Sequence, residues 1–521
     1  MQVYATFWAL LPPIIAIVLA LITKEVYSSL FIGIVVGALF YSGFSFEGTL
    51  NHIFFEEVDD ASYGMISVLS DSSNVGILIF LVILGALVAL MNNAGGSAAF
   101  GRWATTHIKT RVGAQLATIA LGVLIFVDDY FNCLTVGSVM RPVTDTHNIS
   151  RAKLAYLIDA TAAPICIIAP ISSWAAAVAG FASKSDANGI ALFISAIPYN
   201  FYALLTILMM ITLSVTKTDF GPMAIHERNA LKGDLFTTEN RPYADADAHE
   251  DTSKGKVIDL VLPVVVLVVA CVIGLIYTGG FFSGESFVSA FANCSASMGL
   301  VLGSSVALVF AIIFFIIRRV LSFKDCMACI PEGFKAMVPA ILILTFAWTL
   351  KSMTDSLGAA EFVAGVVKAS AGSFMNFLPA VIFLIACLLS FATGTSWGTF
   401  GILIPIVLAV FGTDSGALST ISMSACMAGA VCGDHCSPIS DTTIMSSAGA
   451  QCDHVNHVST QLPYAISVAG ISFITYLICG VLITVGMANP VWVALPLGIV
   501  LTIVYIMLMK RATSKKYASQ A

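Results

Sequence analysis

Long apolar runs recur along this 521-residue chain, and several reach the length needed to cross a lipid bilayer. A membrane-spanning helix needs about 20 consecutive apolar residues. Hydrophobic residues make up 58% of the chain and charged residues only 10%, well below the share typical of soluble proteins. The clearest runs are residues 7–22, 75–91, 190–213, 257–277, 306–317 with its flanks, and 491–509. The sequence therefore predicts an all-α polytopic membrane protein in contact with the lipid bilayer.

The composition excludes several other classes of protein. The net charge of −6 argues against a nucleic-acid partner, because such partners require a basic surface. The pairs Cys326/Cys329 and Cys432/Cys436 lack the second ligand pair of a zinc site, so no transition metal is expected. The N-terminus lacks the basic region and cleavage site of a secretory signal, so the first apolar run is expected to stay as a helix.

A charged segment divides the apolar chain into two halves. Residues 217–256 are rich in Asp, Glu, Lys and Arg, and we interpret residues 215–256 as a cytoplasmic linker. No Gly-Lys-Ser/Thr loop that could hold nucleotide phosphates occurs in it or elsewhere, which argues against ATP-driven transport. The predicted organisation is a first repeat at 1–214, the linker, a second repeat at 257–486, and a final helix with a cytoplasmic tail at 487–521.

The positions of lysine and arginine predict how the chain crosses the membrane. Residues 45–74 and 279–300 contain neither residue type and are expected outside, because cytoplasmic loops carry the excess of basic residues. The basic loops, the linker and the C-terminal tail are then cytoplasmic, and the N-terminus is outside. On this path the two halves are inverted repeats, each with five spans and one re-entrant hairpin, and an eleventh span follows near 490–509. The full spans are predicted near 7–23, 26–44, 75–93 and 190–214 in the first half, and near 257–278, 301–317, 337–355 and 458–486 in the second half.

Each predicted repeat contains a hairpin and a broken helix. The first hairpin lies near 112–142 and the first broken helix near 152–183; the second pair lies near 376–411 and 416–447. Interrupted helices at matching places in two repeats are typical of the binding sites of secondary transporters. The alternative for each hairpin is a full membrane span.

The first repeat carries carboxylates and hydroxyls at these breaks. Acidic side chains inside a membrane are costly and therefore usually functional. A membrane-surface turn is the alternative for the hairpin residues. The predicted ion or solute site of this repeat comprises Asp128, Asp129, Asn132, Thr135, Ser172 and Ser173.

The second repeat is denser in oxygen ligands. Hydroxyls, backbone carbonyls and one or two carboxylates are the ligands that a hard cation such as Na⁺ prefers. The alternatives are a packing seam of small residues at the hairpin and a cytoplasmic loop at the broken helix. The predicted Na⁺ and H⁺ site comprises Thr393, Thr395, Ser396, Thr399, Asp434, Ser437, Ser440, Asp441, Thr442 and Thr443.

Four other polar or charged side chains lie in the apolar segments, and we expect structural roles for three of them. We expect His435 to be a hydrogen-bonded neighbour of the site rather than a proton shuttle. Lys351 and Asp355 are four residues apart, so we expect them to pair on one face of a helix. Asp159 is a further intramembrane carboxylate with no assigned role.

Two motifs of the second repeat resemble those of the NhaC-type Na⁺/H⁺ antiporter family. They are Gly-Thr-Ser-Trp-Gly-Thr-Phe at 394–400 and Gly-Asp-His-Cys-Ser-Pro-Ile-Ser-Asp-Thr-Thr at 433–443. The resemblance implies that the motif hydroxyls and carboxylates, from Thr395 to Thr443, bind the ions. It also implies an elevator-type movement of a transport domain against a scaffold, and a homodimer.

The predicted function is ion-coupled secondary active transport rather than enzymatic catalysis. We expect exchange of Na⁺ for H⁺ by alternating access across a bacterial cytoplasmic membrane, with these two ions and no other cofactor. The alternative is a Na⁺-coupled transporter or exchanger of a small amino acid or organic acid. A channel is disfavoured by the two half-sites in inverted repeats.

Overall fold

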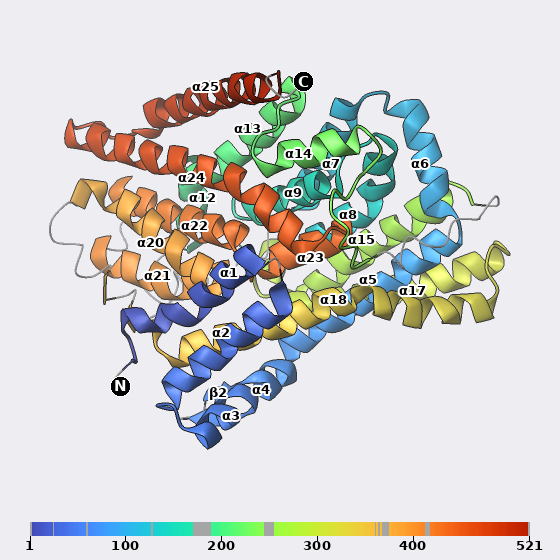
Figure 1. The fold of residues 1–521 in the computed structure, drawn as a ribbon, viewed down its shortest axis with the longest axis horizontal. Coiled ribbons are helices and arrows are strands. Elements are labelled where there is room, and N and C mark those ends of the chain that lie inside the picture. The colour runs from blue at the N-terminus through green and yellow to red at the C-terminus, as the bar shows by residue number, and fades with distance from the viewer. Residues whose placement is uncertain are drawn as a thin grey trace.

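The computed structural model is almost entirely helical. It describes the whole chain except residues 1–2, 24, 59–60, 127–128, 170–173, 175–188, 244–254, 360, 363–364, 367–374, 412–416 and 519–521. The two described strands, β1 (Glu56–Val58) and β2 (Ala61–Tyr63), form one short antiparallel hairpin in which Glu56 pairs with Tyr63. The all-α prediction therefore holds apart from this hairpin, which lies at one edge of the molecule (Figure 1).

Helices lie at each predicted full span of the first half. Of the predicted broken helix near 152–183, α9 and α10 are described, and residues 170–173 and 175–183 lie outside the described chain. The predicted span near 75–93 corresponds to α5, and the span near 190–214 corresponds to α12 and α13. The helices of this half, with those of the linker, are α1 (Leu11–Thr23), α2 (Val26–Tyr41), α3 (Phe46–Phe54), α4 (Met65–Ser70), α5 (Ser72–Asn93), α6 (Gly96–His107), α7 (Arg111–Leu124), α8 (Asp129–Thr146), α9 (Arg151–Thr161), α10 (Ala163–Cys166), α12 (Gly189–Ala196), α13 (Phe201–Thr216) and α14 (Pro222–Ala230).

The second half follows a similar order. Its predicted spans correspond to α15, α17, α18 and α24, and the appended eleventh span corresponds to α25. The helices are α15 (Ile258–Thr278), α16 (Phe287–Ala292), α17 (Ala296–Ile317), α18 (Phe323–Ser356), α20 (Leu378–Thr393), α21 (Ser396–Phe411), α22 (Ala417–Cys436), α23 (Asp441–Ala450), α24 (His454–Thr484) and α25 (Val491–Ala518).

Fewer helices than predicted reach the length of a full span. Among the described residues, six helices are long and apolar enough to cross a membrane, or eight if each of two bent pairs is one span. The bends are 47° between α12 and α13, and 44° within α18. The helices at the first two predicted spans have only 13 and 16 residues, which is short for a bilayer core about 30 Å thick. The count of eleven spans therefore stays a prediction.

The helices break at the polar segments that the sequence singled out. In the second half, α20 ends at Thr393 and α21 begins at Ser396, while α22 ends at Cys436 and α23 begins at Asp441. Gly394 has a left-handed backbone (φ +64°), and a Cβ there would lie 2.6 Å from the carbonyl oxygen of Ile439. Glycine thus allows the tip of the α20–α21 hairpin to touch the break between α22 and α23.

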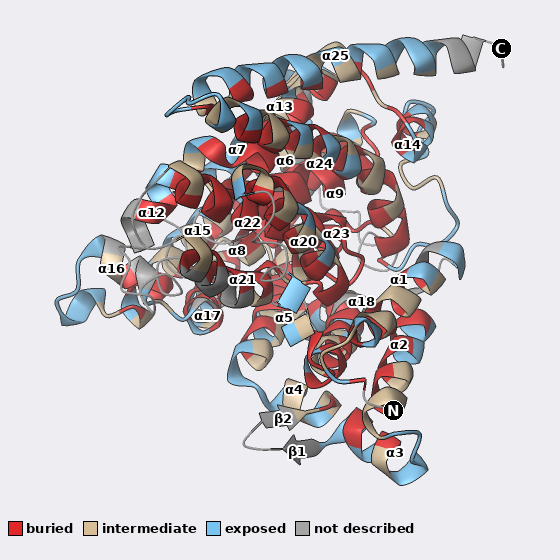
Figure 2. Cartoon of the chain, turned by 90° about the vertical axis from the view of Figure 1, so that its left-hand side faces the viewer, coloured by how far each residue is buried: buried red, intermediate tan, exposed pale blue. Residues whose placement is uncertain are grey.

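The two halves contain comparable groups of packed helices. Helices α7 and α8 both contact α9, as α20 and α21 both contact α22. Helix α13 contacts α7 and α9, and α24 likewise contacts α20 and α22. The two halves are in contact where α23 packs against α8 and α9, in the buried centre of the molecule (Figure 2). The inverted relation of the halves stays a prediction.

The first part of the predicted linker is packed against the helices. Asp219 lies 2.7 Å from the Lys153 ammonium of α9 and accepts a hydrogen bond of 2.7 Å from the hydroxyl of Tyr464. Glu227 of α14 pairs with Arg111 at the start of α7 and accepts from the backbone N–H of Ser150. Two acidic side chains of the linker therefore pair with basic residues at the starts of α7 and α9, and residues 217–243 form part of the fold. The remaining linker residues up to 254 lie outside the described chain.

The contact between α8 and α23 tests the packing at the centre. A Cβ on Gly137 would lie 2.4 Å from the carbonyl carbon of Gly449, closer than any normal contact. We expect Gly137→Ala to destabilise the protein by about 1–3 kcal/mol, because the two helix backbones must separate. Thermal unfolding in detergent measures the effect, and Gly470→Ala is the control because a Cβ there meets no atom within 4 Å. Equal melting temperatures for the two variants would contradict this packing.

Candidate functional site

A cavity of about 1270 Å³ reaches the polar break between α22 and α23. Its floor includes the hairpin tip (Thr393, Gly394 and Thr395) and the break residues Ile439 and Asp441. One wall is a face of α18 that carries Trp348, Lys351 and Asp355. Further lining residues lie between Phe55 and Ile77 and between Cys294 and Ser297, and several of them, such as Phe55 and Ile66, are exposed, so the cavity opens there. The cavity therefore leads from segments 55–77 and 294–297 to residues of the predicted cation site.

Asp441 is the carboxylate of the predicted cation site that faces this cavity. It occupies the first turn of α23, which begins after an N-cap at Ser440. One carboxylate oxygen accepts a 2.9 Å hydrogen bond from the indole N–H of Trp348, and the other accepts a 3.1 Å bond from the hydroxyl of Tyr130. Both hydrogen-bond donors are neutral, and the Lys351 ammonium also acts electrostatically on this carboxylate. The positive end of the α23 dipole additionally favours its negative charge.

Asp434 lies behind the hairpin tip, near the end of α22. It is 4% exposed and does not line the cavity. One of its oxygens lies 2.7 Å from the hydroxyl of Ser396, which also lies 3.2 Å from the backbone carbonyl of Ala430. Within the described chain its other oxygen has no hydrogen-bond partner. A buried carboxylate with so few donors is unfavourable when ionised, so a proton or a cation stabilises it strongly.

The other predicted hydroxyls of the second repeat mostly donate to the backbone. The side chains of Thr393, Thr399 and Ser437 donate to the carbonyls of Leu389, Thr395 and Phe391, at 2.9, 2.9 and 2.8 Å. Each hydroxyl oxygen keeps a lone pair, so these bonds leave the oxygens able to coordinate a cation. Thr395 accepts a bond from the N–H of Gly398 and lines the cavity.

The residues at the start of α23 point in different directions. The hydroxyls of Ser440 and Thr442 lie 3.0 Å apart, next to the break. The hydroxyl of Thr443 instead donates to Asp159 of α9, at 3.0 Å. The structure thus brings Ser396 to Asp434 and Ser440 to Thr442, whereas Thr443 joins a separate cluster.

Of the predicted first-repeat residues, three are described and all are buried in α8. Asp129 begins this helix and is 1% exposed. The amide nitrogen of Asn132 lies 2.7–3.0 Å from the carbonyls of Gly122, Ile125 and Thr161. Asn132 therefore connects the α7–α8 break to the end of α9. Thr135 lies two turns into the helix, and Asp128, Ser172 and Ser173 fall outside the described residues.

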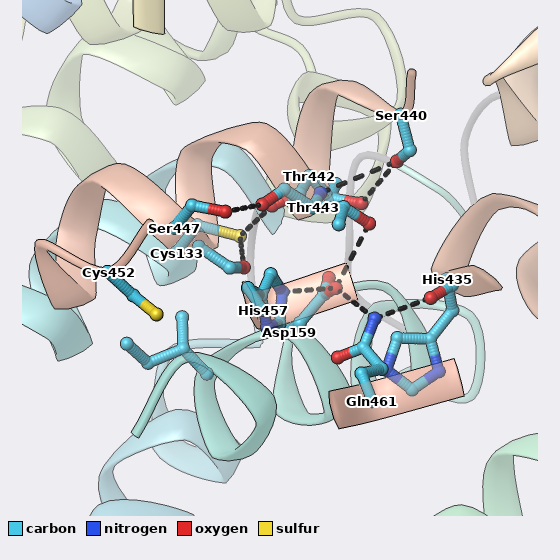
Figure 3. Close-up of polar contacts among 12 residues, drawn as sticks. Cys133, Asp159, His435, Ser440, Thr442, Thr443, Ser447, Cys452, His457 and Gln461 are labelled. Atoms are coloured by element: carbon cyan, nitrogen blue, oxygen red, sulfur yellow. Dashed lines mark hydrogen bonds and ion pairs between the residues drawn. The ribbon is translucent and has the colours of Figure 1, made fainter. Parts of the chain in front are cut away.

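A buried cluster around Asp159 is the main feature that the sequence interpretation missed. One oxygen of Asp159 accepts from Thr443 (3.0 Å) and Gln461 (2.7 Å) and lies 3.2 Å from the ring of His457 (Figure 3). The side chain of Gln461 also contacts the backbone carbonyl of His435. Asp159 precedes the α9–α10 break by three residues, which was the available local signal; its partners lie 284–302 residues away.

His435 is a hydrogen-bonded neighbour of this cluster, in agreement with the interpretation from the sequence. Its ring nitrogen Nδ1 lies 2.7 Å from the hydroxyl of Tyr202 in α13. It stands next to Asp434 in α22, yet it faces away from the cavity, where it is not a lining residue. His435 therefore joins α22 to α13 rather than facing the cavity.

The expected pairing of Lys351 with Asp355 is not observed. Within the described chain no ion pair shorter than 4.0 Å connects them, although both line the cavity. The Lys351 side chain instead extends toward the second hairpin, where its Cε would lie 3.8 Å from a Cβ on Gly398. The four-residue spacing places both side chains on the cavity face of α18, where Lys351 acts on Asp355 electrostatically without forming a close ion pair.

Replacement of Asp159 tests whether this cluster stabilises the fold. Asp159→Leu leaves three donors without their acceptor, and each lost partner costs about 1–3 kcal/mol. We therefore expect a marked fall in the melting temperature of the detergent-solubilised protein. Asp159→Asn is the matched control, because its amide oxygen still accepts hydrogen bonds at the same place. A Leu variant as stable as the Asn variant would show that the cluster contributes little.

Comparison with known proteins places the chain among transporters. The model of the "Na+/H+ antiporter family" matches residues 154–481, which include the second hairpin, the second broken helix and all but the first two residues of the first broken helix. The chain belongs to this family. It is therefore a multi-pass membrane protein of the antiporter type. The family and its named relatives are transporters and not enzymes.

The names of this protein's relatives mention different solutes. An uncharacterized protein of Haemophilus influenzae is 38% identical over 488 residues, covering 91% of each chain. The malate-2H⁺/Na⁺-lactate antiporter of Bacillus subtilis is 31% identical over 169 residues, covering 32% of this chain and 34% of that one. The arginine/ornithine antiporter of Halobacterium salinarum is 37% identical over 112 residues, covering 21% and 23%.

Proposed function

We propose that the protein exchanges Na⁺ for H⁺ by alternating access, with Asp434 and Asp441 as the carboxylates that carry the ions. The observation behind this proposal is that the two acids bracket one helix break, one facing the cavity and one buried behind the hairpin tip. Intramembrane carboxylates at a helix break are typical ion sites in secondary transporters.

Competition between Na⁺ and H⁺ for the same carboxylate would couple the fluxes of the two ions. A buried carboxylate needs one positive charge for neutrality, which either a proton or Na⁺ supplies. Near Asp434, Na⁺ would find the hydroxyl of Ser396 and the carbonyl of Ala430, both hard oxygen ligands. The hydroxyls of Ser440 and Thr442, which lie 3.0 Å apart next to the break, would supply two further oxygen ligands. Since one site cannot hold both ions, binding of either displaces the other.

The cavity suggests which side is open in this state. Its mouth is formed by segments 55–77 and 294–297, which belong to the regions that the charge pattern predicts outside. On the predicted cytoplasmic side, residues 217–243 pack over the ends of α9 and α24. We therefore interpret this conformation as outward-open. A moving transport domain, inverted repeats, a homodimer and location in the bacterial inner membrane are part of the same proposal.

A second candidate is exchange or co-transport of an organic solute. Two relatives bear names that include malate, lactate, arginine and ornithine. The cavity of about 1270 Å³ also exceeds by far the space that Na⁺ needs. Na⁺ coupling at Asp434 and Asp441 would be common to both candidates.

Purified protein in liposomes tests the Na⁺/H⁺ exchange. Vesicles loaded with NaCl and diluted into Na⁺-free medium should acidify inside, because outward Na⁺ flux drives protons inward. A trapped pH-sensitive dye records the change, and vesicles loaded with KCl or lacking the protein provide the baselines. Acidification equal to these baselines would refute the proposed exchange.

A further inference from the structure

The cavity lies between two groups of packed helices. In the first group, α18 packs against α2 and α5, and α17 also packs against α5 (Figure 1). In the second group, α23 packs against α8 and α9. The first group contributes Trp348 and Lys351 to the cavity lining. The second contributes Tyr130 and Asp441. Alternating access by a moving domain requires relative movement at a boundary of this kind.

Asp441 receives interactions from both sides of this boundary. Tyr130 donates to one carboxylate oxygen at 3.1 Å from α8, in the same group as α23. Trp348 donates to the other oxygen at 2.9 Å from α18, in the opposite group. Lys351 follows Trp348 by one turn of α18 and attracts the same carboxylate, as well as that of Asp355 on its own helix. The two interactions from α18 therefore join the groups through the negative charge of Asp441.

These two interactions depend on whether Asp441 holds a cation. The ion-free carboxylate is stabilised by the indole N–H and by the ammonium. It would lose both if α18 and α23 moved apart, which would leave an uncompensated charge in the membrane interior. A bound Na⁺ cancels the charge of the carboxylate and is itself repelled by the ammonium of Lys351. Occupancy of Asp441 therefore weakens the attachment of α18 to α23, and a ligand with such a preference shifts the equilibrium between two states.

We infer that Trp348 and Lys351 form a coupling lock, which holds the ion-free Asp441 and prevents the empty carrier from changing state. An exchanger must suppress this change, because an empty carrier that returns across the membrane lets Na⁺ flow downhill without a counter-ion. The lock opens when a transported ion occupies Asp441. This inference rests on the proposed exchange and names residues that enforce its coupling. Trp348 and Lys351 are thus positioning residues rather than ion ligands.

The number of protons that enter liposomes per Na⁺ that leaves tests the coupling lock. The vesicles are loaded with radioactive Na⁺ and diluted into Na⁺-free medium, with equal K⁺ and valinomycin on both sides to cancel the membrane potential. Lost radioactivity reports Na⁺ efflux, and a trapped dye reports proton entry. Trp348→Phe keeps an aromatic ring but removes the N–H. We expect it to raise the Na⁺ efflux that no proton accompanies by roughly 10- to 100-fold, the effect of losing one hydrogen bond to a charged group. Lys351→Gln should act in the same direction.

Tyr130→Phe is the matched comparison, because it removes the other donor to Asp441 from within one group of helices. Its ratio of protons to Na⁺ should equal that of the wild type. The same holds for Lys335→Gln, which removes an exposed lysine of α18. Exchange of internal for external Na⁺ should continue in Trp348→Phe and Lys351→Gln, because this exchange never uses the empty carrier. An unchanged ratio in these two variants, or an equal change in Tyr130→Phe, would overturn the inference.

The affinity for Na⁺ is a second readout that needs no transport. An ion that binds only the folded protein raises its melting temperature according to the ratio of free ion to Kd. Lys351→Gln removes a positive charge that opposes Na⁺ binding, so the affinity should rise by roughly two- to fivefold. A lower affinity would contradict the lock, since Lys351 would then support the ion-bound state. Acidification by wild-type vesicles reports on the proposed exchange itself, so the two proposals can fail independently.

Discussion

Asp441→Asn is expected to lower Na⁺-driven proton exchange by at least about 30-fold in liposomes. Asparagine keeps the size of the side chain and can still accept from Trp348 or Tyr130, but it removes the charge that attracts Na⁺. Removing one charge from a close charge pair costs about 2–5 kcal/mol. The lower of these values corresponds to the roughly 30-fold fall in transport rate. The initial rate of acidification in Na⁺-loaded vesicles measures it.

Asp71→Asn provides the matched control for this substitution. Asp71 also lines the cavity, but its carboxylate caps α5 by accepting from the backbone N–H groups of Ser73 and Asn74, both at 2.9 Å. Asparagine is about as good a helix cap as aspartate, so the fold should be preserved. We expect this variant to transport at close to the wild-type rate. Similar losses in both variants would mean that overall cavity charge, rather than Asp441, governs transport.

The second large effect is expected for Asp434→Asn, which should remove the pH dependence of Na⁺ binding. In the wild type, a carboxylate that must release a proton to bind Na⁺ binds the ion more weakly as the pH falls. The affinity then drops by up to about tenfold per pH unit for each displaced proton. Asparagine cannot bind that proton, so the variant should bind Na⁺ weakly and with a flatter pH profile. Na⁺-dependent stabilisation measured at several pH values reports both quantities.

Ser396→Ala separates the loss of a ligand from the loss of the titrating group. It removes the hydroxyl at 2.7 Å from Asp434 but keeps the carboxylate. A hydrogen bond to a charged group contributes about 1.5–3 kcal/mol, so Na⁺ affinity should fall by roughly 10- to 100-fold while its pH dependence remains. An Asp434→Asn variant with the wild-type pH profile would assign the competition to another carboxylate.

The helix breaks and the two central carboxylates could be predicted because their signals are local. Glycine, proline and clustered polar residues interrupt apolar runs, and a bilayer tolerates such interruptions only where they are buried or line a cavity. The breaks at 394–395 and 437–440 lie within the predicted segments for this reason. The family motifs then pointed to Asp434 and Asp441.

The remaining features depend on contacts between distant parts of the chain. Asp159 gains its partners from helices that are 284–302 residues away, so no spacing in the sequence could reveal them. The separation of Lys351 from Asp355 depends on the open cavity between α18 and the hairpin tip. The packing of residues 217–243 depends on basic residues at the ends of α7 and α9, which a count of charges in the linker cannot show.

Proton release on Na⁺ binding tests most directly whether the two ions compete for the same carboxylates. Purified protein in weakly buffered detergent solution is titrated with NaCl while a pH-sensitive dye reports the free protons. We predict a release that saturates with Na⁺, is absent with KCl, and is reduced in Asp434→Asn and Asp441→Asn. Na⁺ binding that raises the melting temperature without releasing protons would contradict the account.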